Sequence, residues 1–269
     1  FGLLGAKADP SARIARSGLR GIIRGPLESC GTRYLFENTD DPTLLRLSSA
    51  EDRVTIVGGA GVDPAALKPA PMPQIPPLKI AVVSRMLWSK GVDLAVKATR
   101  QARANGVDVS LSLYGAPDPG NPKSIPVDRL TEWSKLEGIE WRGRTGDASS
   151  VWRDHHICCL PSRGGEGLPR TLLEGAACGR PLLTTDVPGC RGFVRDGIEG
   201  FVVPPEDPGA LAEAIARFAR DAATVAGMGA AARRRVLDGY TEADVIRTVQ
   251  GVYREMLADR IAADGRDRR

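Results

Sequence analysis

Short apolar runs, separated by stretches with helical spacing, dominate residues 78 to 203. In Val109 to Tyr114 large apolar residues alternate with serine, which is the period of a strand. The strand-like runs are Leu78 to Ser84, Val109 to Tyr114, Ile139 to Trp141, His156 to Leu160, Pro181 to Thr185 and Phe201 to Val203. Strands that alternate with helices predict a parallel sheet covered on both faces. The expected fold class is α/β, with a Rossmann-like doubly wound domain over residues 78 to 240.

The first seventy residues do not show this alternation. They predict only two strands and two helical pieces, at Ala12 to Arg24, Tyr34 to Phe36, after Asp40, and at Val54 to Val57. Two strands do not make a doubly wound sheet, so residues 1 to 70 are expected to be part of another domain.

Two further stretches complete the organisation of the chain. Five prolines in the nine positions from Pro69 to Pro77 predict a stiff linker, with the domain boundary at residues 71 to 77. At the other end, apolar residues recur at helical spacing from Val245 to Met256. Residues 241 to 269 therefore predict a last helix with a basic tail.

Composition excludes several classes of function. The formal net charge of the 269 residues is +4, too small and too dispersed to predict a nucleic-acid partner. No run approaches the roughly 18 apolar residues of a spanning helix and no signal segment opens the chain, so a cytoplasmic protein is expected. The arginines at 233 to 235 and the tail from Arg260 predict solvated faces, compatible with peripheral contact with an anionic membrane at the inner face of the plasma membrane. Five cysteines, of which Cys158 and Cys159 are adjacent, predict reduced packing residues and no disulfide framework.

A glycine-rich loop between a predicted strand and a predicted helix is the stretch richest in chemistry. Three glycines stand in this loop, Gly164, Gly165 and Gly167, and the helix after it begins near Pro169 and ends near Gly179. Glycines let the backbone approach a ligand closely, and free amides at a helix start favour an anion such as a diphosphate. Glu166 lies in the loop and Glu174 about two turns into the helix. The alternative for this stretch is a helix start with one solvated and one salt-bridged acid.

Two cations follow the first strand of the sheet. Arg85 and Lys90 lie at its carboxyl end, where open α/β sheets bind ligands. They would complement a diphosphate, Arg85 by forked hydrogen bonds and Lys90 as a point charge. Spacing alone favours the alternative of two solvated surface cations.

The phrase around the two glutamates resembles the donor-site signature of a known family. Glu166 and Glu174 are separated by seven residues within Glu-Gly-Leu-Pro-Arg and its continuation, and Gly-Arg-Pro-Leu-Leu-Thr-Thr-Asp-Val-Pro-Gly-Cys-Arg follows. The likeness runs on through Gly200-Phe-Val-Val-Pro204. This is similar to retaining glycosyltransferases of family four, which have the GT-B fold, and most of all to bacterial enzymes that extend lipid-linked or surface polysaccharides.

The resemblance implies roles for residues that spacing alone leaves open. Arg85 and Lys90 match the family's diphosphate-binding Arg-x4-Lys-Gly phrase, and the backbone at Gly167 and Leu168 would stabilise the same leaving group. Glu166 would orient the transferred sugar, and Glu174 would accept hydrogen bonds from the ribose. The loop with Arg144 and Thr145 would lie along the nucleobase, although an ordinary connecting loop is the equal alternative for these residues. Gly115 would line the donor site.

The implied activity is transfer of a sugar from a nucleotide sugar, a UDP-hexose or UDP-N-acetylhexosamine, to a lipid-linked or other saccharide acceptor. No cofactor is implied, because the nucleotide sugar is a substrate. No Asp-x-Asp phrase is present to hold a metal-bridged diphosphate. Residues 36 to 41 and 57 to 63 look like the end of the family's amino-terminal, acceptor-binding domain, onto which its last helix crosses back. The chain is therefore expected to begin partway through that domain, so the competing hypothesis is a non-catalytic nucleotide-binding fragment or half of a split enzyme.

Overall fold

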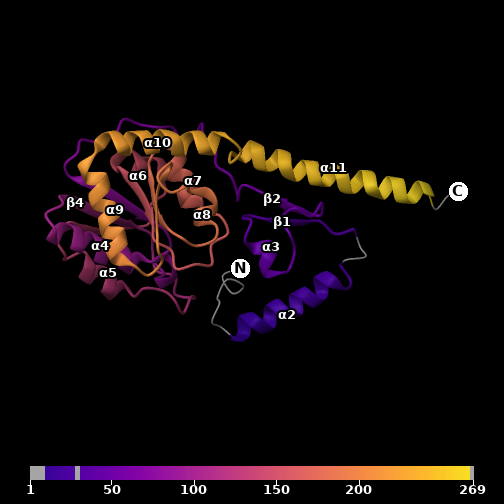
Figure 1. The fold of residues 1–269 in the computed structure, drawn as a ribbon. Helices are drawn as coiled ribbons and strands as arrows, with labels where there is room; N and C mark the ends of the chain where they lie inside the picture. The colour runs from indigo at the N-terminus through magenta and orange to yellow at the C-terminus, as the bar shows by residue number, and fades with distance from the viewer. Residues whose placement is uncertain (1–9, 28–30, 267–269) are drawn as a thin grey trace.

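A six-stranded parallel sheet forms the centre of the protein, whose computed structural model describes residues 10–27 and 31–266 (Figure 1). The strands are β3 (Leu78–Val83), β4 (Val109–Tyr114), β5 (Ile139–Gly143), β6 (Ile157–Leu160), β7 (Leu182–Thr185) and β8 (Gly200–Val203). Their order is β5-β4-β3-β6-β7-β8. All six predicted strands are confirmed, each within two residues of its expected bounds. The order reverses between β3 and β6, so a crevice opens at the carboxyl ends of these two strands.

Helices cover both faces of the sheet, as the doubly wound prediction requires (Figure 1). One face carries α4 (Val92–Ala104), α5 (Val127–Trp133) and α9 (Pro208–Arg220), and the other carries α6 (Ala148–Asp154), α7 (Arg170–Ala177), α8 (Cys190–Phe193) and α10 (Ala222–Leu237). Successive side chains of a strand point to opposite faces of the sheet, and this alternation decides which of the two hydrophobic cores a strand residue enters. Ile80 and Val82 pack in the α4 core, whereas Ala81 between them packs in the α7 core.

The residues before the linker form a small unit with its own core. Its elements are α2 (Pro10–Arg24), β1 (Tyr34–Phe36), α3 (Asp41–Leu44) and β2 (Val54–Ile56), and β1 pairs with β2 in parallel. Ile23, Leu45, Leu47 and Val54 are buried together. The two strands and two helical pieces predicted here are confirmed.

The last helix, α11 (Glu242–Arg266), returns to this amino-terminal unit and extends past β1 and β2 (Figure 1). Asp259 near its end forms an ion pair of 2.8 Å with Arg33. At its start, Glu242 donates its backbone N–H to Val62 O (3.0 Å), and the N–H of Val62 reaches Tyr240 O (3.3 Å). The two chain crossings between the units are therefore hydrogen-bonded to each other. None of the helices in residues 10–27 and 31–266 has both the length and the apolar character needed to cross a bilayer.

Two buried side chains attach the proline-rich segment to the sheet domain. The His156 ring is fully buried, accepts the Lys79 backbone N–H at Nδ1 (2.8 Å) and donates from Nε2 to Pro73 O (3.0 Å). Arg180, also fully buried, donates to Ala70 O (3.0 Å), and its burial lowers the pKa of its guanidinium. The segment itself has no regular secondary structure from residue 68 to 77.

Folding stability should fall in mild acid because His156 and its neighbour His155 are held neutral. Burial lowers the pKa of both imidazoles below the 6.5 of a free histidine. The two histidines therefore become protonated at a higher pH in the unfolded chain than in the folded protein. The stability present above about pH 6.5 is lost as the pH falls through the lowered pKa values of the folded state. Urea unfolding midpoints between about pH 7.5 and pH 5 measure the loss. The double variant His155→Phe, His156→Gln should show a smaller decline, and an equal decline would contradict this origin.

Two expectations about surface and cysteine chemistry are settled by the packing. The prediction of a solvated face at residues 233 to 235 is wrong for Arg233, which donates to Leu67 O at 3.0 Å and also to Ala177 O. The reason is that α10 packs directly against α7, so Arg233 reaches carbonyls left free at the helix end.

Cys158, Cys159, Cys178 and Cys190 are buried free thiols, as expected. Cys30 lies outside the described residues, as do residues 267–269 of the basic tail.

Candidate functional site

A pocket of about 560 Å³ opens where β3, β4 and β5 end. Each strand is followed by a loop that contributes to its wall, with Arg85 after β3, Gly115 after β4, and Arg144 and Thr145 after β5. Four predicted site residues, far apart in the sequence, are thus brought to one cavity. Because parallel strands end at the same edge of the sheet, this position is the one expected for a ligand of an open α/β fold.

Gly115 forms a wall of this pocket that no other residue could form. Its φ is 145°, which residues other than glycine rarely adopt. An added Cβ would also lie 1.8 Å from Ser84 O, so this position requires glycine. The N–H of Gly115 donates to Gly143 O (2.7 Å), which ties the ends of β4 and β5 together. The pocket wall is therefore backbone at this point, and a flat ligand can lie against it.

Arg85 is held at the mouth of the pocket by an acid that sequence reasoning did not single out. Its Nη1 lies 2.9 Å from Oδ2 of Asp118, and 63% of the Arg85 side chain is exposed. Asp118 is itself positioned by donation of its N–H to Ser124 Oγ (2.9 Å). Asp118 follows the end of β4 by four residues, and this position at a strand end is the sequence signal that could have identified it.

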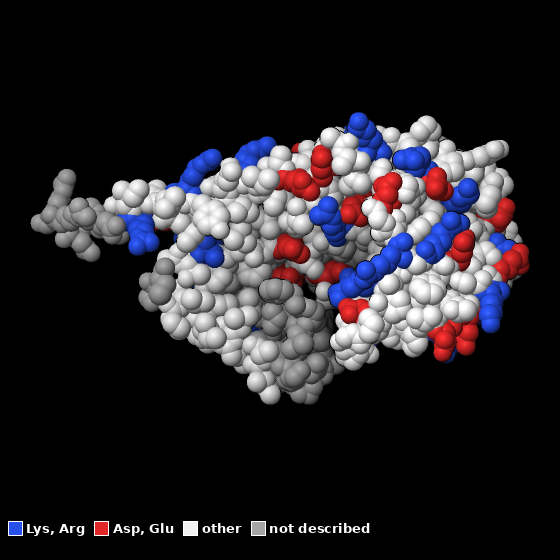
Figure 2. Space-filling model, turned by 180° about the vertical axis from the view of Figure 1, so that it is seen from behind, with Lys and Arg blue, Asp and Glu red and all other residues white. Residues whose placement is uncertain are grey.

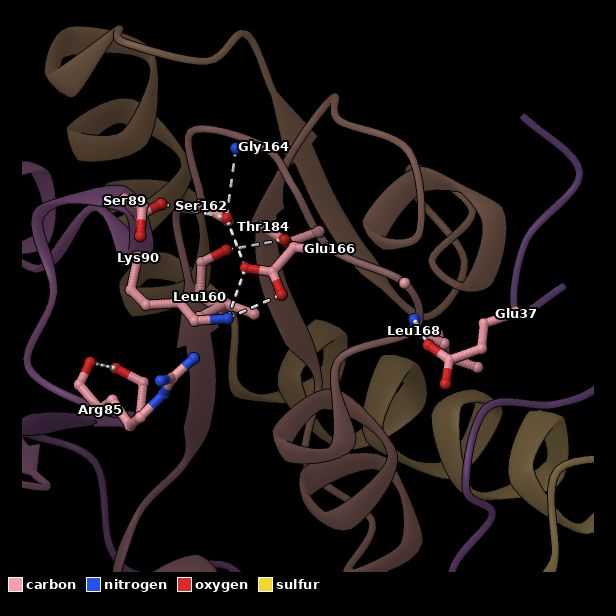
Figure 3. Close-up of polar contacts among 12 residues, drawn as sticks. Glu37, Arg85, Ser89, Lys90, Leu160, Ser162, Gly164, Glu166, Leu168 and Thr184 are labelled. Carbon is pink, nitrogen blue, oxygen red and sulfur yellow. Dashed lines mark hydrogen bonds and ion pairs between the residues drawn. The ribbon is translucent and has the colours of Figure 1, made fainter. Parts of the chain in front are cut away.

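Lys90 and Glu166 form an ion pair at the crevice between β3 and β6 (Figure 3). The ammonium lies 2.8 and 2.7 Å from the two carboxylate oxygens of Glu166, whose side chain is only 7% exposed. Ser162 Oγ donates to Oε1 of the same carboxylate (2.6 Å). The buried charge of Glu166 is thus compensated by Lys90 and a hydroxyl, as a charge at such depth requires.

A close backbone approach brings Lys90 to this place. Lys90 ends the turn η1 (Trp88–Lys90), and an added Cβ on the next residue, Gly91 with φ 69°, would lie 1.8 Å from Pro161 O. The N–H of Arg163 donates to Ser89 O (2.9 Å) across the same junction. The loops after β3 and β6 are therefore joined, and Lys90 and Glu166 meet because of this junction.

Arg163 fixes the loop from the opposite side. Its guanidinium binds both carboxylate oxygens of Asp93 at 2.7 and 3.0 Å and Glu206 at 2.6 Å. The hydrogen bonds that Arg163 donates to Asp93 raise the pKa of Arg163. Burial alone would raise the pKa of Asp93, but the hydrogen bonds and charge of Arg163 outweigh it and lower that pKa. The glycine-rich loop thus has a rigid base, and the roles of these two residues are structural.

The peptide between Gly167 and Leu168 is held by the amino-terminal unit. Oε2 of Glu37 accepts the N–H of Leu168 (2.9 Å), and Nδ2 of Asn38 donates to Gly167 O (3.1 Å). Asn38 is buried, and its Oδ1 accepts the N–H groups of Asp40 and Asp41 at the start of α3. Sequence reasoning placed residues 36 to 41 in the acceptor-side domain and assigned them no contact with this loop.

Glu174 does not join the other predicted residues. Its carboxylate accepts from Arg170 Nε (2.9 Å) one turn earlier on α7, and its side chain is 16% exposed. Glu174 is not among the described residues that line the pocket of Arg85 and Gly115. Both glutamates are salt-bridged in this structure, so this stretch has the salt-bridged acid of the simple alternative but not its solvated acid.

Residue types that bind metals or nucleic acids are dispersed over the described part of the molecule. Residues 10–27 and 31–266 contain no cluster of three or more His, Cys, Asp or Glu side chains arranged to hold a metal ion. On the face shown in Figure 2, basic and acidic side chains are interspersed, so that face has no stripe of one sign.

Comparison with known proteins identifies the family. A family model described as "Glycosyl transferases group 1" matches residues 77–221, which is more than half of the chain. The chain belongs to this glycosyltransferase family. The match covers β3 to α9 and includes both the pocket and the Lys90–Glu166 pair.

Relatives of this chain are found among bacterial polysaccharide proteins. It is 31% identical over 180 residues to a putative colanic acid biosynthesis glycosyltransferase, WcaL, of Salmonella typhimurium, a match that covers 64% of this chain and 43% of that protein. The Escherichia coli protein of the same name is 28% identical over 210 residues, 74% of this chain and 51% of that protein. The chain thus spans about half the length of the curated relatives that it matches.

Solved structures confirm the GT-B fold of the glycosyltransferase. Anabaena Alr3699/HepE in complex with UDP superposes with a TM-score of 0.77 at 16% identity, over 92% of this chain and 70% of that one. A glycosyltransferase from Rickettsia africae superposes with a TM-score of 0.76 at 19% identity, over 94% and 69% of the two chains. At these identities the likeness establishes the fold alone.

Proposed function

We propose that this chain provides the nucleotide-sugar site of a retaining glycosyltransferase that uses a UDP-hexose or UDP-N-acetylhexosamine. The observation that carries the proposal is the convergence of Arg85, Gly115, Arg144 and Thr145 on one pocket beside the Lys90–Glu166 pair. A nucleobase fits the flat pocket wall, and the diphosphate would lie toward the two cations. The UDP bound to the Anabaena structure of the same fold supports this choice of nucleotide.

In the proposed reaction, an acceptor hydroxyl forms a bond to the anomeric carbon as the bond from that carbon to the diphosphate breaks on the same face, and the hydroxyl proton passes to the departing diphosphate oxygen. Arg85 and Lys90 would stabilise the charge that develops on the leaving UDP, which is electrostatic catalysis by positioned donors. The backbone of Gly167 and Leu168 would lie where diphosphate and sugar meet. Glu166, held by Lys90 and Ser162, would orient the sugar, and Glu174 would bind the ribose after leaving Arg170.

The acceptor and cellular setting follow from the relatives. Colanic acid biosynthesis, in the names of two of them, favours a lipid-linked or other saccharide acceptor and a role in surface polysaccharide synthesis. Such an enzyme would act in the cytoplasm, with peripheral contact at the inner face of the membrane.

Titration of UDP into the 269-residue chain tests the nucleotide site, and release of UDP in the presence of a saccharide acceptor tests transfer. Binding of UDP with no affinity for NAD is the expected result. UDP binding without transfer in the complete protein would favour a nucleotide-binding module instead. A chain that does not bind UDP contradicts the proposal.

Binding of UDP should not require a divalent ion. The diphosphate would be neutralised by Arg85 and Lys90, and residues 10–27 and 31–266 contain no group of three or more His, Cys, Asp or Glu side chains that could hold a bridging metal. The dissociation constant measured with EDTA should therefore equal the value measured with magnesium. Loss of binding in EDTA with recovery in magnesium would show that this is wrong.

The two glutamates should differ in their effect on UDP. Glu174→Gln removes a charged acceptor from the ribose and should weaken UDP about tenfold, within the range for one charge-assisted hydrogen bond. Glu166→Gln should not weaken UDP but should lower kcat, because Glu166 would meet only the sugar. Calorimetric titration of both variants is the measurement, with Arg170→Ala as the control for the lost ion pair. Equal losses of UDP affinity in the two glutamate variants would contradict the division of roles.

A further inference from the structure

Glu37 brings a second carboxylate to the loop that carries Glu166. Its Oε2 accepts the Leu168 N–H (2.9 Å), and an added Cβ on Gly167 would lie 1.8 Å from the same oxygen. The other oxygen, Oε1, accepts no hydrogen bond from residues 10–27 and 31–266, and the Glu37 residue is exposed. One oxygen is therefore fixed by the loop while the other is free to accept from a ligand.

The position of Glu37 along the site indicates which part of a ligand it would meet. Figure 3 shows Arg85, Lys90, Glu166, Leu168 and Glu37 in this order from left to right. Arg85 also lines the pocket proposed for the nucleobase, so the nucleotide would occupy the Arg85 end. A donor that extends from there past Lys90 places its sugar toward Glu166 and Glu37.

The two carboxylates differ in how their charge is compensated. Lys90 lies within 2.8 Å of both oxygens of Glu166 and compensates it. Within the described part of the chain, Glu37 forms no ion pair and has only the Leu168 amide as a partner. A carboxylate without a cation accepts hydrogen bonds from sugar hydroxyls and repels a second carboxylate.

We infer that Glu37 determines the charge of the sugar that this site accepts, favouring a neutral, hydroxyl-bearing sugar over a sugar acid. The inference rests on the proposed function and adds to it a residue from the amino-terminal unit. Like charges several ångströms apart near a protein surface should weaken an acidic donor about three- to tenfold.

Calorimetric titration with UDP, UDP-glucose and UDP-glucuronate tests this, because the two donors differ only in the oxidation state of carbon 6. The wild-type chain should bind UDP-glucose about three- to tenfold more tightly than UDP-glucuronate. In Glu37→Gln the two donors should bind alike, with UDP itself unchanged. Glu37→Asp keeps the charge and should keep the preference. Glu213→Gln removes an exposed charge on α9, outside the site, and should also keep it.

Each outcome decides between the inference and the function on which it rests. An unchanged donor preference in Glu37→Gln, or an equal loss of preference in Glu213→Gln or Glu37→Asp, overturns the inference while UDP binding still supports the nucleotide site. Weaker UDP in Glu37→Gln would place Glu37 at the diphosphate and also overturn it. Absence of UDP binding to the wild-type chain overturns the proposed function and the inference together.

Discussion

Lys90→Met should lower the free energy of unfolding of the ligand-free protein by about 3 kcal/mol, the lower end of the range for breaking a buried ion pair. The substitution keeps the length of the side chain but leaves the carboxylate of Glu166, 7% exposed, with Ser162 as its one remaining side-chain partner among the described residues. An uncompensated buried charge costs far more than the lost attraction alone. Urea unfolding followed by circular dichroism measures the change.

The double variant Lys90→Met, Glu166→Gln is the matched control. It removes both charges and leaves a neutral amide that can still accept from Ser162, so it should recover most of the lost stability. A double variant as unstable as Lys90→Met would show that the cost arises from packing of the lysine chain. Full stability of Lys90→Met would show that the carboxylate is solvated or protonated at no cost.

Arg85→Ala should weaken UDP by about ten- to a hundredfold, the value of one charge-assisted hydrogen bond to a phosphate, and leave uridine nearly unchanged. The arginine stands at the pocket mouth with 63% of its side chain exposed, so its loss should not disturb the fold. Uridine carries the base and ribose without the diphosphate, which makes it the internal reference. Calorimetric titration with the two ligands gives the comparison.

Two variants separate the site effect from general charge effects. Arg129→Ala removes an exposed cation on α5 that pairs with Glu132, and it should leave both ligands unchanged. Asp118→Asn frees Arg85 from its acidic partner and should tighten UDP by a few-fold. Equal losses of UDP and uridine in Arg85→Ala would place this arginine at the nucleoside instead.

The fold and the composition of the pocket could be predicted because they depend on local patterns. Alternation in Val109 to Tyr114 marked a strand, and the position of Arg85 at a strand end predicted a place beside a ligand. Gly115, Arg144 and Thr145 were assigned from the family resemblance, and all three line one pocket with Arg85. The helix end at Gly179 was marked by its residue type, and the structure gives that glycine a φ of 74°. The phrase from Glu166 to Glu174 that marked the family lies on the loop after β6 and on α7.

The partners of the site residues could not be predicted in the same way. The family resemblance, and not spacing alone, assigned Lys90 to a ligand, but its contact with Glu166, 76 residues away, depends on how two loops pack. The contact of Glu37 with Leu168 spans 131 residues and two structural units. Arg233 was expected in solvent because its neighbours are arginines, and only the packing of α10 on α7 shows the carbonyls that it binds. Patterns of a few residues do not encode such long-range contacts.

The paired crossings at Val62 and Tyr240 to Glu242 restrict how the two units can move. Two chain segments that are hydrogen-bonded to each other act as one hinge, so the units can rotate about it but cannot slide apart. Of the contacts between them, those from Glu37 to Leu168 and from Asn38 to Gly167 hold the glycine-rich loop and would break as such a rotation opens the crevice. The loop would then be released on the side of the amino-terminal unit while Lys90 and Arg163 still hold it from within the sheet domain. Opening of this molecule would therefore expose the sugar end of the site and leave the nucleotide end intact.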